Sequence, residues 1–120
     1  MPEYSNDQID QVRELERAVL GGLMLETERY DNVRLVISHA DFHGKDHQSI
    51  FESMGDLVNA GKPLDPITVA DRLDSKNLLT RAGGKNYLIE LASSSPSAAN
   101  LETYAELIRQ KSISRKLMKI

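Results

Sequence analysis

The stretch Leu15-Glu16-Arg17-Ala18-Val19-Leu20-Gly21-Gly22-Leu23-Met24-Leu25 decides the fold of this chain. Its apolar side chains recur at helical spacing, and we expect the helix to run from about Ile9 to Leu25. Two adjacent glycines interrupt it, and each costs about 1 kcal/mol relative to alanine in a helix interior. We interpret Gly21 and Gly22 as a surface without side chains, which lets another helix of the bundle or of another subunit approach closely.

The composition indicates one ordinary domain. A chain of 120 residues buries about two thirds of its unfolded surface, so it needs no crosslinks to fold. It has no cysteine, which excludes disulfides and thiolate metal sites. No apolar run reaches the roughly 20 residues that span a bilayer, and residues 1–5 do not resemble a secretory signal. We therefore expect a cytoplasmic protein with no membrane contact.

Outside the opening stretch, apolar spacing and breaker residues predict five further helices. We expect them at about residues 30–38, 46–60, 66–77, 85–93 and from 97–100 onward. Gly61 should stop one of them, and Asp65 followed by Pro66 should begin the next as N-cap and first helical residue. Ser97 or Asn100 should cap the last. No strand-like alternation competes, so the predicted fold is all-α, a compact bundle of about six short helices.

The predicted elements divide the chain into three parts. We expect a disordered N-terminal tail at residues 1–10, a globular helical head at 11–96, and the first part of a helical hairpin or linker helix at 97–120. Ile113, Leu117 and Ile120 continue the apolar stripe of the last helix beyond what a small bundle must bury. We expect them to pack against a further helix of this chain or of a neighbour, and we interpret the chain as a fragment that ends inside a longer helix.

Charge is distributed unevenly along the chain. Residues 1–31 carry eight acidic side chains against three arginines, whereas residues 109–120 carry five basic side chains and no acidic one. Such polarity can steer a partner or a neighbouring copy. It is equally consistent with cations that stabilise the C-terminus of a helix.

No segment shows a convincing catalytic, cofactor-binding or metal-binding pattern. His39, His43 and His47 are spaced by four, as in a helical zinc site, but Gly44 interrupts the helix that the spacing requires. Gly84-Lys85-Asn86 lacks both the earlier glycine and the serine or threonine of a phosphate loop. The serines at 94, 95 and 97 are typical of turns and caps rather than of a nucleophile elbow.

A helix-turn-helix interpretation is also weak. The predicted helix at 66–77 would be the recognition helix, yet it has no positive excess, and a long proline-containing connection precedes it.

Several segments, taken in order, resemble the N-terminal domain of the bacterial DnaB-type replicative DNA helicase. The resemblance covers roughly residues 13–120. Its segments are Glu16-Arg17-Ala18-Val19-Leu20-Gly21-Gly22-Leu23-Met24-Leu25, Asp41-Phe42 with His47-Gln48-Ser49-Ile50-Phe51, Gly61-Lys62-Pro63-Leu64-Asp65-Pro66-Ile67-Thr68-Val69, and Gly83-Gly84-Lys85-Asn86-Tyr87-Leu88-Ile89-Glu90-Leu91 followed by Pro96-Ser97-Ala98-Ala99-Asn100 and Tyr104-Ala105.

The resemblance implies a function that composition and spacing do not show. In such helicases this domain precedes a RecA-like motor that binds ATP and Mg and unwinds duplex DNA at the replication fork. The full protein is a hexamer, and its N-terminal domains pair as dimers, recruit primase and contact the helicase loader. The fragment itself would be non-catalytic, and DNA would be contacted mainly through the motor. The alternative is a stand-alone helical adaptor or loader-like protein of the replisome.

One departure from the family pattern concerns Lys85. Many relatives carry an aromatic or apolar residue there, after the two glycines that precede the predicted fifth helix. If the position lies at a contact between domains, the lysine should weaken self-association. Such divergence would also fit a phage or plasmid helicase.

Overall fold

The computed structural model describes residues 5–95 and 98–118, and this part of the chain is all-α as predicted. Two 3₁₀ turns, η1 (Thr27–Arg29) and η2 (His39–Asp41), lie on either side of the short helix α2. The helices are α1 (Asn6–Leu25), α2 (Tyr30–Arg34), α3 (Lys45–Asn59), α4 (Pro66–Ser75), α5 (Gly84–Ser94) and α6 (Leu101–Met118).

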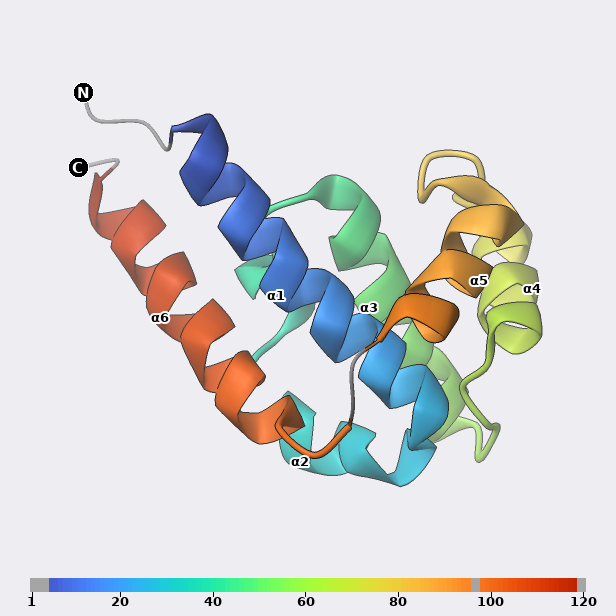
Figure 1. Ribbon diagram of the computed structural model, residues 1–120. Helices are drawn as coiled ribbons and strands as arrows, with labels where there is room; N and C mark the ends of the chain where they lie inside the picture. Colours follow the sequence, from blue (N-terminus) through green and yellow to red (C-terminus); the bar gives the residue numbers. More distant parts are fainter. Residues whose placement is uncertain (1–4, 96–97, 119–120) are drawn as a thin grey trace.

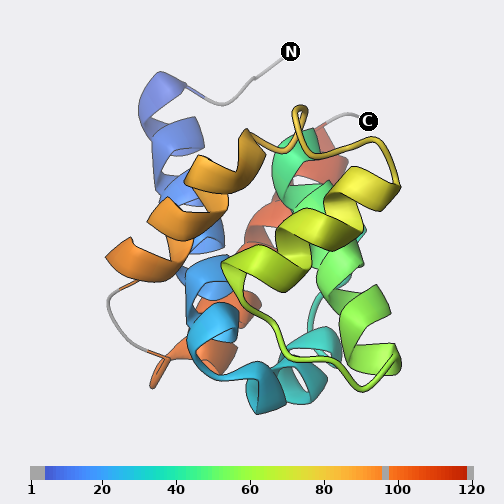
Figure 2. The ribbon, with the colours of Figure 1, turned by 90° about the vertical axis from the view of Figure 1, so that its right-hand side faces the viewer.

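Helix α1 is the central element of the bundle. Helix α6 runs antiparallel along one side of it, so the start of α1 and the end of α6 lie at the same end of the molecule (Figure 1). Helices α3 and α5 pack against its other side, and α4 contacts both of them. Figure 2 shows α4 and α5 side by side, with α1 behind α5. One continuous apolar core joins these helices, with Leu20, Leu23 and Ile50 fully buried in it.

The first helix begins earlier than the sequence predicted. Ser5 accepts a hydrogen bond from the main-chain N–H of Gln8, and the Gln8 side chain accepts one from the N–H of Ser5. This capping box satisfies donors that would otherwise be unpaired at the helix start. The prediction of disorder is therefore wrong for residues 6–10, and residues 1–4 lie outside the described part.

The second helix is shorter than predicted. It ends at Arg34, and the backbone then turns into η2. Asp41 accepts a hydrogen bond from the Ser38 N–H at 2.9 Å, so Ser38, the last residue of the predicted helix, is instead the N-cap of η2.

The other helix boundaries agree with the sequence to within about two residues. Asp65 caps α4 by accepting hydrogen bonds from the N–H groups of Ile67 and Thr68, and Pro66 is the first helical residue. Gly61 has the left-handed backbone expected after a helix end, with φ +72°. Helix α6 begins at Leu101; of its two expected caps, Ser97 lies outside the described residues.

The paired glycines are contact points between helices of the same chain. A Cβ atom on Gly21 would collide with the carbonyl oxygen of Leu91 in α5 and would lie 2.9 Å from the Ser95 Cβ. A Cβ atom on Gly22 would lie 3.3 Å from the Leu101 Cγ at the start of α6. Both α5 and α6 of this chain therefore approach the backbone of α1 at the paired glycines.

Replacement of Gly21 by alanine should destabilise the fold, although alanine is the better helix former. The new methyl group meets a main-chain oxygen that cannot rotate away, and overpacking of this kind costs about 1–3 kcal/mol. Urea unfolding should therefore show a lower midpoint for Gly21→Ala, and Gly22→Leu should also lower it. The control is Gln11→Ala, an exposed position of the same helix. If Gly21→Ala is as stable as the parent chain, the close approach of α5 is not a constraint.

Candidate functional site

A polar network with a fully buried centre joins α1, α3 and α5. The Nδ1 atom of His47 lies 2.7 Å from Glu16 Oε1, and its Nε2 atom lies 2.6 Å from the Tyr87 hydroxyl. The second Glu16 oxygen accepts the main-chain N–H of His43 at 2.6 Å. Glu16 and His47 are both inaccessible to solvent. Because each polar atom has a partner, the network links three helices without an unsatisfied buried charge.

The Tyr87 hydroxyl is the contact that α5 contributes to the network. Burial raises the pKa of Tyr87, so its hydroxyl keeps its proton at neutral pH. It lies within hydrogen-bond distance of the Nε2 atom of His47 and so connects α5 with α3.

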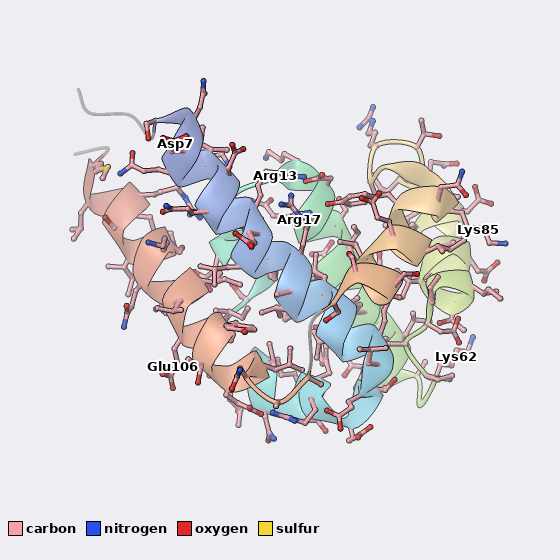
Figure 3. All side chains as sticks on the ribbon, in the orientation of Figure 1. Asp7, Arg13, Arg17, Lys62, Lys85 and Glu106 are labelled. Atoms are coloured by element: carbon pink, nitrogen blue, oxygen red, sulfur yellow. The ribbon has the colours of Figure 1, made fainter. Side chains whose placement is uncertain are left out.

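Arg13 and Asp46 close the network on its solvent side. Arg13 donates to both carboxylate oxygens of Asp46, at 3.2 and 2.8 Å, and its Nη2 atom lies 3.4 Å from His47 Nε2. Burial by itself would raise the pKa of Asp46, but the hydrogen bond from Arg13 and the neighbouring charges lower it below its usual value. In Figure 3, Arg13 and Arg17 extend from α1 toward α3 and α5.

A second buried carboxylate, Asp41, connects η2 with α6. It is 2% exposed, and its Oδ1 atom accepts hydrogen bonds from Ser112 Oγ at 2.7 Å and Arg109 Nη1 at 3.1 Å. Burial by itself would raise the pKa of Asp41, but hydrogen bonds from the Ser38 N–H, Ser112 and Arg109 outweigh it and lower the pKa. The carboxylate therefore stays ionised at neutral pH and attracts the basic face of α6.

The outer face of α6 carries the apolar side chains that the sequence singled out. Ile113 is 43% exposed and Leu117 is 64% exposed, and both follow the last large apolar side chain that α6 buries, Ile108. Ile120 lies outside the described residues. Lys85 is exposed at the start of α5 and points away from the bundle (Figure 3), on a different element from Ile113 and Leu117. Ile113 and Leu117 are therefore exposed to solvent, whereas Gly21 and Gly22 are buried.

The three spaced histidines do not form one face. His47 points into the core, whereas His39 lies at the surface with its Nε2 atom 3.5 Å from Glu52. Within residues 5–95 and 98–118, no group of three histidine or acidic side chains is placed to hold a metal ion. In the same ranges, no helix combines the length and apolar character needed to cross a membrane.

A groove of about 480 Å³ lies along α1, between the end of α5 and the start of α6. It mixes charged, hydroxyl and apolar groups, and it is lined by Glu14, Leu15, Arg17, Ala18, Ser94, Ser95 and Tyr104. The buried network lies outside the groove: Arg17 lines it, but Glu16, His47 and Tyr87 do not.

Sequence reasoning missed Glu16, Asp41 and Tyr87 as positioning residues, and it considered His47 only as a metal ligand. Glu16 carried a usable signal, because it occupies a core position between Val12 and Val19 on the buried stripe of α1. A carboxylate in that position requires a buried partner. The partner could not be identified from the sequence, because His47 is 31 residues away.

Fold and site together define a small all-α domain whose buried polar groups connect its helices. Residues 8–110 match the family described as DnaB-like helicase N terminal domain. The replicative DNA helicase DnaB of Buchnera aphidicola is 44% identical over 107 residues, which are 89% of this chain and 23% of that relative.

Two solved structures share the fold. The N-terminal domain of DnaB helicase from Mycobacterium tuberculosis superimposes with a TM-score of 0.84 at 37% identity, over 88% of this chain and 73% of that one. The N-terminal domain of DnaB helicase from Helicobacter pylori, described with its interactions with primase, gives 0.83 at 25% identity, over 98% and 91%. The chain belongs to the DnaB-like helicase N-terminal domain family, and it spans about a quarter of the length of the helicase relative.

Replacement of His47 by alanine should destabilise the domain strongly. It leaves the buried Glu16 side chain without its imidazole partner, and a buried polar group that loses its partner costs about 1–3 kcal/mol. The matched control is His39→Ala, because His39 also faces a carboxylate but lies half exposed, where such pairs contribute about 0–1 kcal/mol. Chemical unfolding of both variants checks the difference. Equal losses would show that the buried network does not stabilise the fold.

Proposed function

We propose that this chain is the N-terminal assembly and primase-interaction domain of a hexameric, ATP-dependent replicative DNA helicase that unwinds duplex DNA at the replication fork. Family membership supports the proposal, as does the primase interaction described for the Helicobacter pylori domain. The observation that carries it is the arrangement of α6, which is fastened to the head along one side and exposes Ile113 and Leu117 on the other.

The chemistry of the proposed helicase would reside outside this chain. The relative from Buchnera aphidicola is about four times as long as the matched part, and that additional length can hold a motor with its ATP and Mg. DNA would be contacted mainly through that motor, and the protein would act in the cytoplasm. The work of this domain is then docking, to other copies of itself, to primase and to a helicase loader.

Primase binding is the direct test of the proposal. The ¹⁵N-labelled chain should show specific chemical-shift changes when the C-terminal domain of the primase from the same source is added. We expect the changes to cluster on one surface, because a docking domain binds through one contiguous patch. The control partner is the N-terminal part of the same primase. A spectrum that stays unchanged at a large excess of the C-terminal domain contradicts the primase role.

Self-association should depend on the outer face of α6. A chain extended beyond Ile120 should be more stable and form larger oligomers, because additional helix can cover Ile113 and Leu117. Within the extended chain, Ile113→Ser with Leu117→Ser should lower the sedimentation coefficient at a given concentration. A change at Asp71, exposed on α4, is the control. Unchanged sedimentation on extension would contradict the assembly role.

The lysine at position 85 bears on the same proposal. Lys85 is exposed at the start of α5, where a charged side chain opposes burial in an interface. We infer that pairing between N-terminal domains is weaker in this chain than in relatives with an apolar residue there.

A further inference from the structure

The two halves of α6 are attached to the head by different kinds of contact. Its first half buries an apolar stripe made of Leu101, Ala105 and Ile108. From residue 109 to the end of the described helix at Met118, the one buried side chain is that of Ser112, which is polar. Apolar burial therefore fixes the first half, whereas the second half needs another attachment.

That attachment converges on one residue, Asp41. Four side chains from the second half of α6 reach it. Besides the hydrogen bonds from Ser112 and Arg109, the Lys116 Nζ atom lies 3.7 Å from Oδ1. Arg115 donates to the main-chain oxygen of Asp41 at 2.8 Å. Two successive turns of the helix thus share a single acceptor residue.

Asp41 is itself held rigidly by the head. Its Oδ2 atom accepts the Ser38 N–H, which fixes the η2 turn. The next residue, Phe42, is 1% exposed in the core, and its main-chain oxygen accepts a hydrogen bond from Gln48 of α3 at 2.8 Å. The acceptor is therefore preorganised, and only α6 has to adjust to it.

We propose that Asp41 is a positioning residue that latches the second half of α6 to the head and so sets the direction in which its outer face points. The latch is polar and depends on the Asp41 carboxylate. Removal of this carboxylate therefore releases the contacts that Arg109, Ser112 and Lys116 make with Oδ1, all at once. The bundle core, which the first half of α6 completes, stays intact. Only the identity of the partner on this face rests on the proposed function.

The position of α6 can be measured without any partner. The chain has no cysteine, so two introduced cysteines carry spin labels without interference. One label is placed at Glu90→Cys on α5 and the other at Leu117→Cys in the second half of α6, both at exposed positions. Pulsed electron paramagnetic resonance should give one narrow distance distribution in the parent chain. Asp41→Ala should broaden it and move its mean.

Two controls separate a released latch from general loosening. The label pair Glu90→Cys with Glu106→Cys reports on the first half of α6 and should keep its distribution in the Asp41→Ala chain. Asp56→Ala removes another carboxylate that accepts from two cations, Arg72 and Lys76, but on the α3–α4 side. That variant should leave the distribution between positions 90 and 117 unchanged.

Exposed partners of the latch keep the test decisive if Asp41→Ala does not fold. Arg109 and Lys116 are 47% and 60% exposed, so their joint replacement by alanine spares the core and should broaden the same distribution in part. A folded Asp41→Ala chain, or a folded double variant, with the parent distribution overturns the proposal. A primase titration without chemical-shift changes would contradict the proposed function but would not alter the measured label distances. The two proposals can therefore fail independently.

Discussion

The close approach of α5 and α6 to the backbone of α1 is the constraint on which the rest of the structure depends. Gly21 admits the Leu91 carbonyl and Gly22 admits the Leu101 side chain, so both neighbours lie closer than a Cβ atom would allow. The conformational cost of two glycines in one helix is about 2 kcal/mol. That cost is offset by the burial of Leu20 and Leu23 in the core that the approach creates.

The buried polar groups follow from this arrangement. Once α5 lies against α1, Tyr87 of α5 reaches His47 of α3. Glu16 of α1 then completes the network by contacting the other ring nitrogen of His47. Apolar packing alone tolerates several similar arrangements of helices, whereas a charged group fully removed from water tolerates only those that keep its partners. We therefore infer that this network selects one relative arrangement of α1, α3 and α5.

Much of the fold could be predicted from the sequence, because its signals are local. The Asp65-Pro66 helix start and the Gly61 helix end depend on neighbouring residues, and both were confirmed. The capping box at Ser5 was missed, although Gln8 three residues later is its local signature. The early end of α2 was also missed, because the turn after it depends on Asp41, whose other partners lie about 70 residues away in α6. Pairings over such distances have no local pattern, so the buried networks could not be predicted.

The contrast between the two kinds of attachment bears on what a docking domain needs. Apolar contacts make the head cohesive, since their contribution scales with buried area and no single side chain controls it. Directional contacts such as those between Asp41 and Ser112 fix the angle of an element while burying little area. The second half of α6, held in this way, keeps Ile113 and Leu117 uncovered, because its attachment uses polar side chains. The polar composition of the inner side of this second half is therefore what leaves the apolar side chains on its outer side exposed.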